Sequence, residues 1–349
     1  MHVPDGFINA PVSVAAGVAA VAAVAVSLRG ARRELDERTA PLAGLVAAFI
    51  FAVQMLNFPV AAGTSGHLLG GALAAILVGP YTGVLCVSVV LLMQGILFAD
   101  GGLTALGVNI TVMGVVTVLL SYGVFRGLLK VLPGSRPYVT VSAFAGALIS
   151  VPGAAAAFTA LYAIGGTTDV PIGKVFTAMV GVHLLIGIGE AAITAATVGA
   201  VIAVRPDLVH GARGLAAPLK LRVGGELVDA PAAAPAPAAA RSTKKVWATG
   251  LVTALVLAGF VSYYASASPD GLEKVAADQK FDAAAEEHAA AGSPLADYSV
   301  KDVTDARLSG GLAGAIGVGA TVAVGTGVFW VVRRRRTDEQ PVSAPVSAG

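Results

Sequence analysis

Long apolar segments alternate with short polar ones along most of the chain. A helix that crosses a membrane needs about 20 mainly apolar residues, and the sequence predicts spans at residues 10–28, 41–58, 67–79, 83–99, 104–125, 138–164, 174–204, 246–264 and 309–332. The third is too short for a full crossing, so we expect it to be tilted or partly re-entrant. We interpret the first as a retained helix rather than a removed signal, because no basic region precedes it. The pattern predicts an all-α polytopic membrane protein.

One long interruption divides this pattern into two parts. It contains an alanine–proline tract at residues 230–237, which has too few packing groups to fold and is typical of a semi-rigid linker. Between the last two spans, the acidic, alanine-rich residues 273–288 are expected to form a surface helix. We therefore predict a seven-span core at 1–205, a cytoplasmic Ala/Pro-rich linker at 206–243, a two-span domain at 244–336 with an external segment at 265–308, and a disordered tail at 337–349.

The basic residues orient the predicted spans. Lys and Arg are enriched in cytoplasmic loops, and a single orientation with the N-terminus outside and the C-terminus in the cytoplasm places these residues inside: Arg29, Arg32, Arg33, Arg38, Arg126, Lys130, Arg136, Arg205, Lys244, Lys245 and Arg333 to Arg336. We expect a multi-pass protein of the cell membrane. The composition agrees, with 56% hydrophobic and 13% charged residues and a mean hydropathy of +0.80.

Net charge and cysteine content narrow the classes of function. A net charge of +2 carries little information about partners, and we expect no nucleic-acid partner. The single cysteine, Cys86, lies in an apolar span, which excludes a disulfide framework or a thiolate cluster. The chain has no P-loop, zinc-protease or nucleophile-elbow motif, so we expect a protein that is not an enzyme. Active transport would take its energy from another subunit or from an ion gradient.

The first residues carry a metal-chelating pattern. The amine of Met1 and the amide nitrogen of His2 can close a five-membered ring on a metal, and the amide and the imidazole Nδ1 of His2 can close a six-membered one. Three nitrogens then lie in one plane with a fourth position vacant. Planar nitrogen sites suit Cu(II) and Ni(II), and displacement of an amide proton needs a strongly polarising metal. The alternative is that His2 is an incidental second residue.

A second histidine lies on the same predicted side of the membrane. His67 follows the second span in a glycine-rich loop, Gly63–His67, so it can supply the fourth nitrogen. The turn Pro4-Asp5-Gly6 can fold the N-terminus back over the helix ends. Asp5 is a candidate acceptor for an imidazole N–H. For His67 considered alone, a structural role remains the alternative.

Two ionisable residues lie within the seventh predicted span. His183 and Glu190 are seven residues apart and so share one helix face. Ionisable groups in a membrane usually face the bundle interior or a cavity. They are candidates for a supporting, path or gating role, and a buried pair that fixes helix packing is the alternative.

Three segments resemble a known family. Residues Met1–Phe7, the loop that ends at His67, and Gly187–Thr194 are similar to the cobalt/nickel substrate-binding membrane component of energy-coupling factor (ECF) transporters, called CbiM or NikM, over roughly residues 1–205. Residues Pro269–Ala276 resemble the small two-span partner domain, NikN or PDGLE, that is often fused to it.

This resemblance implies a function and a set of partners. It implies an ECF S-component-like helical core that binds Co²⁺ or Ni²⁺ through the Met1 amine, the His2 amide and imidazole, and His67. It also implies a transmembrane coupling subunit and two cytoplasmic ATPases as partners, with cobalt serving cobalamin synthesis or nickel serving metalloenzymes. The ion is then a transported substrate, and no cofactor is permanently bound. We expect the second domain to regulate access to the N-terminal site.

Two other functions remain open. One is a gradient-driven cation carrier whose ion path uses His183 and Glu190. The other is an intramembrane metalloenzyme that uses the same two residues, although such a site usually needs a third ligand. The residues do not distinguish cobalt from nickel.

Overall fold

Helices form most of the core of this computed structural model, which describes residues 1–36, 39–61, 63–213, 220–223, 226–229 and 243–337. The helices of the core are α1 (Ala10–Glu34), α2 (Thr39–Gln54), α3 (Gly71–Val78), α4 (Pro80–Leu97), α5 (Leu106–Asn109), the π-helix η1 (Ile110–Val116), α6 (Thr117–Val131), α7 (Arg136–Gly165) and α8 (Ile172–Val204). A short hairpin of β1 (Phe58–Pro59) and β2 (Ser65–Gly66) joins α2 to α3.

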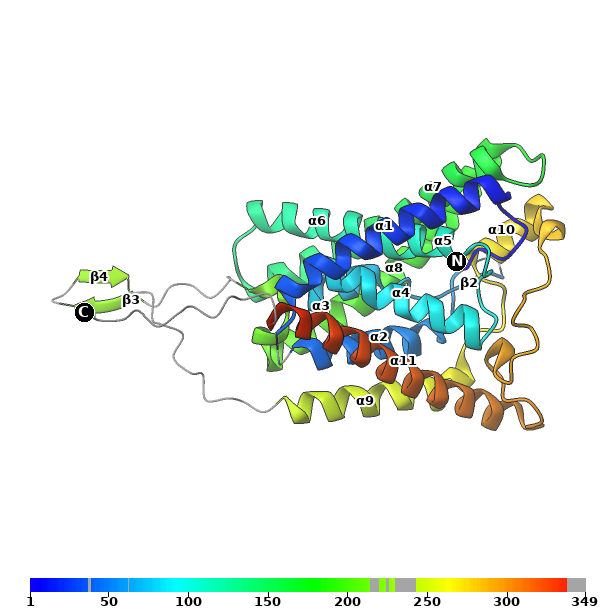
Figure 1. Cartoon of the computed structure of the whole chain (residues 1–349). Coiled ribbons are helices and arrows are strands. Elements are labelled where there is room, and N and C mark those ends of the chain that lie inside the picture. The colour runs from blue at the N-terminus through cyan, green and yellow to red at the C-terminus, as the bar shows by residue number, and fades with distance from the viewer. Residues whose placement is uncertain (37–38, 62, 214–219, 224–225, 230–242, 338–349) are drawn as a thin grey trace, which may run out of the picture.

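The second domain adds two long helices and a segment between them. Its elements are α9 (Lys244–Gly259), the 3-10 turn η4 (Val261–Tyr264), α10 (Gly271–Gln279), the 3-10 turns η5 (Asp282–Ala284) and η6 (Ala296–Tyr298), and α11 (Ala306–Thr337). In Figure 1, α9 and α11 run along one side of the bundle, and α10 lies at the same end of the molecule as the N-terminus.

Seven helices in the described part of the chain are long and apolar enough to cross a membrane, which confirms the all-α polytopic class. They are 10–34, 80–97, 106–131, 136–165, 172–204, 244–264 and 306–334. The second and third predicted spans are shorter helices, α2 with 16 residues and α3 with 8. All eight residues of α3 are buried, so this short helix lies inside the bundle rather than against lipid.

Helix α1 shows how the bundle packs. Asn9 caps its start by accepting a hydrogen bond from the Val12 amide. Its buried residues are mostly small, such as Ala16 and Ala20, whereas Val18 is exposed. Membrane helices pack closely through small residues because lipid gives little hydrophobic drive for association. The exposed apolar side chains therefore suit contact with lipid.

The second domain packs directly on the core. Gly44 of α2 allows this contact, because a Cβ atom there would lie 2.4 Å from the Thr326 hydroxyl oxygen of α11. At the other end of the domain, the Phe281 ring lies 5.2 Å from the Phe7 ring and 5.0 Å from the Tyr162 ring, measured between centroids. The core and the second domain thus share one packed interior.

The predicted linker is partly folded in the structure. Residues of the predicted linker form 3-10 turns at Pro206–Leu208 and His210–Ala212, and Val209 between them is fully buried, so the packed core extends beyond residue 205. A short hairpin follows, made of β3 (Lys220–Val223) and β4 (Glu226–Asp229). The alanine–proline tract and residues 338–349 of the predicted tail lie outside the described residues.

The predicted surface helix is also shorter than expected and is not a free surface helix. It forms only as α10, whose Leu272, Val275 and Ala276 are buried, and it packs against α8. Because of this packing, the segment between α9 and α11 lies against the end of the core.

Candidate metal centre

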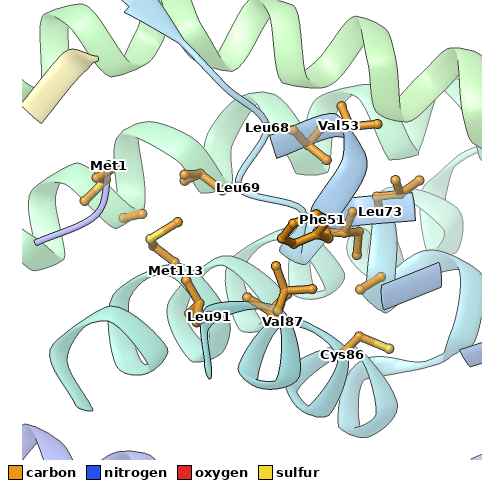
Figure 2. Close-up of a cluster of buried hydrophobic side chains, with 14 of the residues drawn as sticks. Met1, Phe51, Val53, Leu68, Leu69, Leu73, Cys86, Val87, Leu91 and Met113 are labelled. Atoms are coloured by element: carbon orange, nitrogen blue, oxygen red, sulfur yellow. The ribbon is translucent and has the colours of Figure 1, made fainter. Parts of the chain in front are cut away.

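The first residues of the chain are fixed inside the protein. The Met1 side chain is only 2% exposed, and Figure 2 shows it in the same buried cluster as Leu69 and Met113. Asn109 holds the next turn: its Oδ1 accepts from the Val3 amide at 2.8 Å, and its Nδ2 donates to the Val3 carbonyl at 3.0 Å. These contacts place the N-terminal amine at one position in the bundle.

Asp5 stabilises the turn that follows. Asp5 was predicted to accept from an imidazole N–H, and the structure gives it other partners. Its carboxylate accepts from the Leu103 amide at 3.2 Å and from the Thr104 amide and hydroxyl at 2.8 and 2.5 Å. Asp5 therefore ties the N-terminal turn to the loop before α5.

The structure brings the amine of Met1 and the imidazole of His67 together. The amine nitrogen lies 2.7 Å from His67 Nε2, and both residues are buried. His67 Nδ1 lies 3.0 Å from the Leu68 carbonyl, to which it donates when it carries the ring proton. The lone pair of Nε2 then faces the amine. Two nitrogens at about 2.0 Å from one ion and at right angles are about 2.8 Å apart, so this spacing suits two neighbouring ligands of one metal.

His2 lies beside these two groups. Its ring is nearly parallel to that of His67, with 5.1 Å between centroids and 18° between planes. His2 Nε2 lies 3.2 Å from Gln94 Oε1, and Nδ1 lies 3.2 Å from Asp100 Oδ1. Burial lowers the pKa of His2 to about 4, although the Asp100 carboxylate opposes this shift. A lowered pKa favours the neutral imidazole, which is the form that binds a metal.

An aspartate of the second domain completes this cluster. Asp270 Oδ2 lies 2.5 Å from the Met1 amine and 3.6 Å from His67 Nε2. Burial alone would raise the pKa of Asp270, but the adjacent ammonium group and His67 hold it well below its usual range. Asp270 was not predicted from the sequence. The pattern Asp270-x-x-Glu273 marks a helix start, but nothing in it points to a contact with Met1.

Glu190 supports the loop that carries His67. Its carboxylate accepts from the Leu69 amide at 2.7 Å and from the Gly70 amide at 3.1 Å, at the start of α3. His183 lies nearer the cluster, since its Cε1 is 2.9 Å from the position of a Cβ on Gly271. His183 Nδ1 lies 2.8 Å from the Met179 carbonyl, and Nε2 is buried without a hydrogen-bond partner. The two residues share a face of α8, as predicted, with different partners.

The cluster opens onto a cavity of about 650 Å³ between the core and the second domain. The cavity is lined by His2 and His67 on the core side, and by Asp270 and Tyr298 on the other. The Tyr298 hydroxyl donates to Asp100 Oδ2 at 2.5 Å. Within the described residues, no group of three His, Cys, Asp or Glu side chains is placed to hold a metal by side chains alone.

Comparison with known proteins identifies the family. The family model described as the cobalt uptake substrate-specific transmembrane region, CbiM, matches residues 2–208, and the PDGLE domain model matches residues 244–334. The chain belongs to the CbiM family. Its CbiM region and PDGLE domain correspond to the core and the second domain described above, as the resemblance of the sequence predicted.

Relatives of the CbiM region are transport proteins. The chain is 41% identical over 147 residues to the fused nickel transport protein NikMN of Rhodobacter capsulatus, which is 42% of each chain. It is 36% identical over 195 residues to the cobalt transport protein CbiM of Sorangium cellulosum, which is 54% of this chain and 84% of that protein. A crystal structure of a transition metal transporter aligns with a TM-score of 0.53 and 27% identity, over 58% of this chain and 93% of that one. These relatives are named as metal transport proteins.

Proposed function

We propose that this chain is the substrate-capture membrane component of an ATP-driven uptake transporter for Co²⁺ or Ni²⁺. The ion is bound by the Met1 amine, the amide and Nδ1 of His2, and Nε2 of His67. The observation that carries this proposal is the 2.7 Å between the Met1 amine and His67 Nε2 in a buried site. Four nitrogens in one plane favour Ni(II)-type geometry, and both metals remain candidate substrates.

The proposal includes an orientation and partners. The N-terminus and His67 face the outside, and the basic ends of the spans and the C-terminus face the cytoplasm. A transmembrane coupling subunit and two cytoplasmic ATPases supply the energy, because the sequence has no P-loop of its own. The similarity to nickel and cobalt transport proteins supports the choice of ion.

The ligands can be tested by uptake of radioactive nickel or cobalt in cells that express the chain with its partners. We expect His2→Ala, His67→Ala, and one residue added before Met1 each to reduce uptake to background, since each removes or displaces a nitrogen. Asp278→Asn on the exposed part of α10 is a matched control and should leave uptake unchanged. Normal accumulation in the three variants would refute the proposal.

The carrier hypothesis predicts a different energy source. A gradient-driven carrier that uses His183 and Glu190 would lose uptake when the proton gradient is collapsed. In the present proposal, uptake stops when the partner ATPases are inactivated. Two backbone amides donate to the Glu190 carboxylate and hold it in place. This favours a positioning role for Glu190 over a role in carrying ions.

A further inference from the structure

The contact between Asp270 and the N-terminal amine links the two family regions inside the buried ligand cluster. Asp270 belongs to the PDGLE domain, whereas Met1 and His67 belong to the core, and the carboxylate lies within 2.5 Å of one proposed ligand and 3.6 Å of the other. We propose that Asp270 is a further ligand of the ion site. Its carboxylate supplies an oxygen and a negative charge to the bound Co²⁺ or Ni²⁺. This inference rests on the proposed function and assigns the PDGLE domain a direct part in binding.

The two carboxylate oxygens of Asp270 have separate tasks. Oδ1 accepts from the Leu272 amide at 2.7 Å and from the Glu273 amide at 2.9 Å, and so caps α10. Oδ2 points to the Met1 amine instead. An N-cap needs only one acceptor oxygen, so helix capping explains Oδ1 and leaves Oδ2 for the ion site.

The backbone around Asp270 is built for a close approach to the core. The Ser65 amide donates to the Pro269 carbonyl at 2.8 Å, and the Ser65 hydroxyl donates to the Ser268 carbonyl at 2.7 Å. A Cβ atom on Gly271 would lie 2.8 Å from Ile186 Cδ1. Only a residue without a side chain fits at this position without displacing its neighbours, so the fold holds Asp270 against the site from both flanks.

Charge balance explains why a carboxylate is needed here. A divalent ion bound by an amine, two neutral imidazoles and one deprotonated amide keeps a net charge of one. An unpaired charge in a buried site is unfavourable, and Asp270 is only 8% exposed. One carboxylate would neutralise this charge in the loaded site, as it neutralises the ammonium group of Met1 in the structure.

The test uses the purified full chain in lipid nanodiscs, with Ni²⁺ or Co²⁺ alone as the probe. Retained metal is measured by equilibrium dialysis and mass spectrometry, and the environment of Co²⁺ is measured by its absorption spectrum. Asp270→Asn keeps a good helix cap and removes the charge. We expect it to weaken retention of both ions at least about tenfold, as loss of a group that supports a metal site does, and to shift the Co²⁺ spectrum.

Two further variants make the result decisive. Gly271→Val should push α10 away from Ile186 and weaken retention in the same way, although Asp270 itself is unchanged. Asp278→Asn, which alters an exposed carboxylate on the same helix, should retain the ions as the wild type does. Unchanged or tighter retention by Asp270→Asn would overturn this inference while wild-type binding upholds the proposed function. A wild-type chain that retains neither ion would overturn both.

Discussion

Asn109 contributes more to the site than its place in an apolar helix suggests. Its side chain pairs with both polar groups of the Val3 backbone, as a neighbouring strand would. The π-helix Ile110–Val116 begins at the next residue, and such turns are frequent at functional sites. Fixing Val3 in this way fixes the position of the Met1 amine two residues before it.

Replacement of Asn109 should therefore weaken ion binding without removal of any ligand. Asn109→Ala leaves the buried Val3 amide without its acceptor, at a cost of about 1–3 kcal/mol, while the Val3 carbonyl keeps its hydrogen bond from the Gly102 amide. We expect roughly tenfold weaker Ni²⁺ retention in equilibrium dialysis. Asn109→Asp keeps the acceptor for the Val3 amide and should have a smaller effect. Equal retention by Asn109→Ala and the wild type would show that Asn109 does not position the amine.

The Glu190→Gln variant distinguishes a positioning role of this carboxylate from a role in an ion path. In Glu190→Gln, one oxygen becomes an NH₂ group that can face the Leu69 or Gly70 amide, so that one donor loses its acceptor. We expect a loss of about 1–3 kcal/mol of stability, seen as a lower melting temperature of the apo protein, together with weaker Ni²⁺ retention. A variant with unchanged melting and unchanged retention but slower uptake would favour the carrier hypothesis instead.

Some residues of the site could be predicted from the sequence, and others could not. Met1, His2 and His67 were predicted together because the chelate needs a fourth nitrogen and the basic residues place His67 on the same side as the N-terminus. Asp270 was missed because nothing local links it to a residue 269 positions away. The predicted partner of Asp5, an imidazole N–H, was wrong, because the side chain of a turn residue can also accept from nearby backbone amides.

Among the elements, α2 and α11 form the most extensive interface between the two domains. The approach depends on Gly44, whose position leaves no space for a side chain against Thr326. The sequence predicted both helices from their apolar residues, with α2 shorter than expected. It did not predict their pairing, because many helices in this chain carry small residues and spacing alone does not select a partner.

Gly44→Val should loosen this interface. An added side chain must displace Thr326, and overpacking of a close interface costs about 1–3 kcal/mol. Trp247 and Trp330 are the only two tryptophans of the chain and both lie in the second domain, so tryptophan fluorescence during thermal unfolding should report a lower transition temperature. Gly319→Val on α11, where a Cβ would meet no atom within 4 Å, is the matched control. Equal transitions for the two variants would contradict the proposed contact.

At the scale of the whole molecule, the second domain covers the end of the core at which the proposed ligands lie. Figure 1 shows α10 beside the N-terminus, with the chain continuing along that end toward α11. The Phe98 and Tyr298 rings, one from each domain, lie 4.8 Å apart beside the cavity. The sequence predicted an external segment that regulates access. Asp270 and Tyr298 of this segment line the cavity beside His67, which supports that proposal.

Locking the segment should therefore slow ion exchange. In a Cys86→Ala background, which removes the only cysteine, the pair Ser65→Cys and Ser268→Cys is a candidate cross-link, because the Ser65 hydroxyl donates to the Ser268 carbonyl at 2.7 Å and so brings the two residues close together. We expect the oxidised full chain to take up and release Ni²⁺ at least about tenfold more slowly than the reduced one, with recovery on reduction.

A second cross-link distinguishes the effect of closing the site from the effect of joining the two domains at another point. The pair Leu45→Cys and Gly250→Cys joins α2 to α9, since a Cβ on Gly250 would lie 3.3 Å from Leu45 Cγ. Leu45 packs with Leu42 and Leu208, in the cluster that also contacts Trp247 near the start of α9 and away from His67. Oxidation of this pair ties the same two domains together but leaves the external segment free, so Ni²⁺ exchange should keep its normal rate.

If both disulfides slowed exchange equally, motion between the domains as a whole would control access. If neither did, the ion would reach His67 by a route that the second domain does not cover.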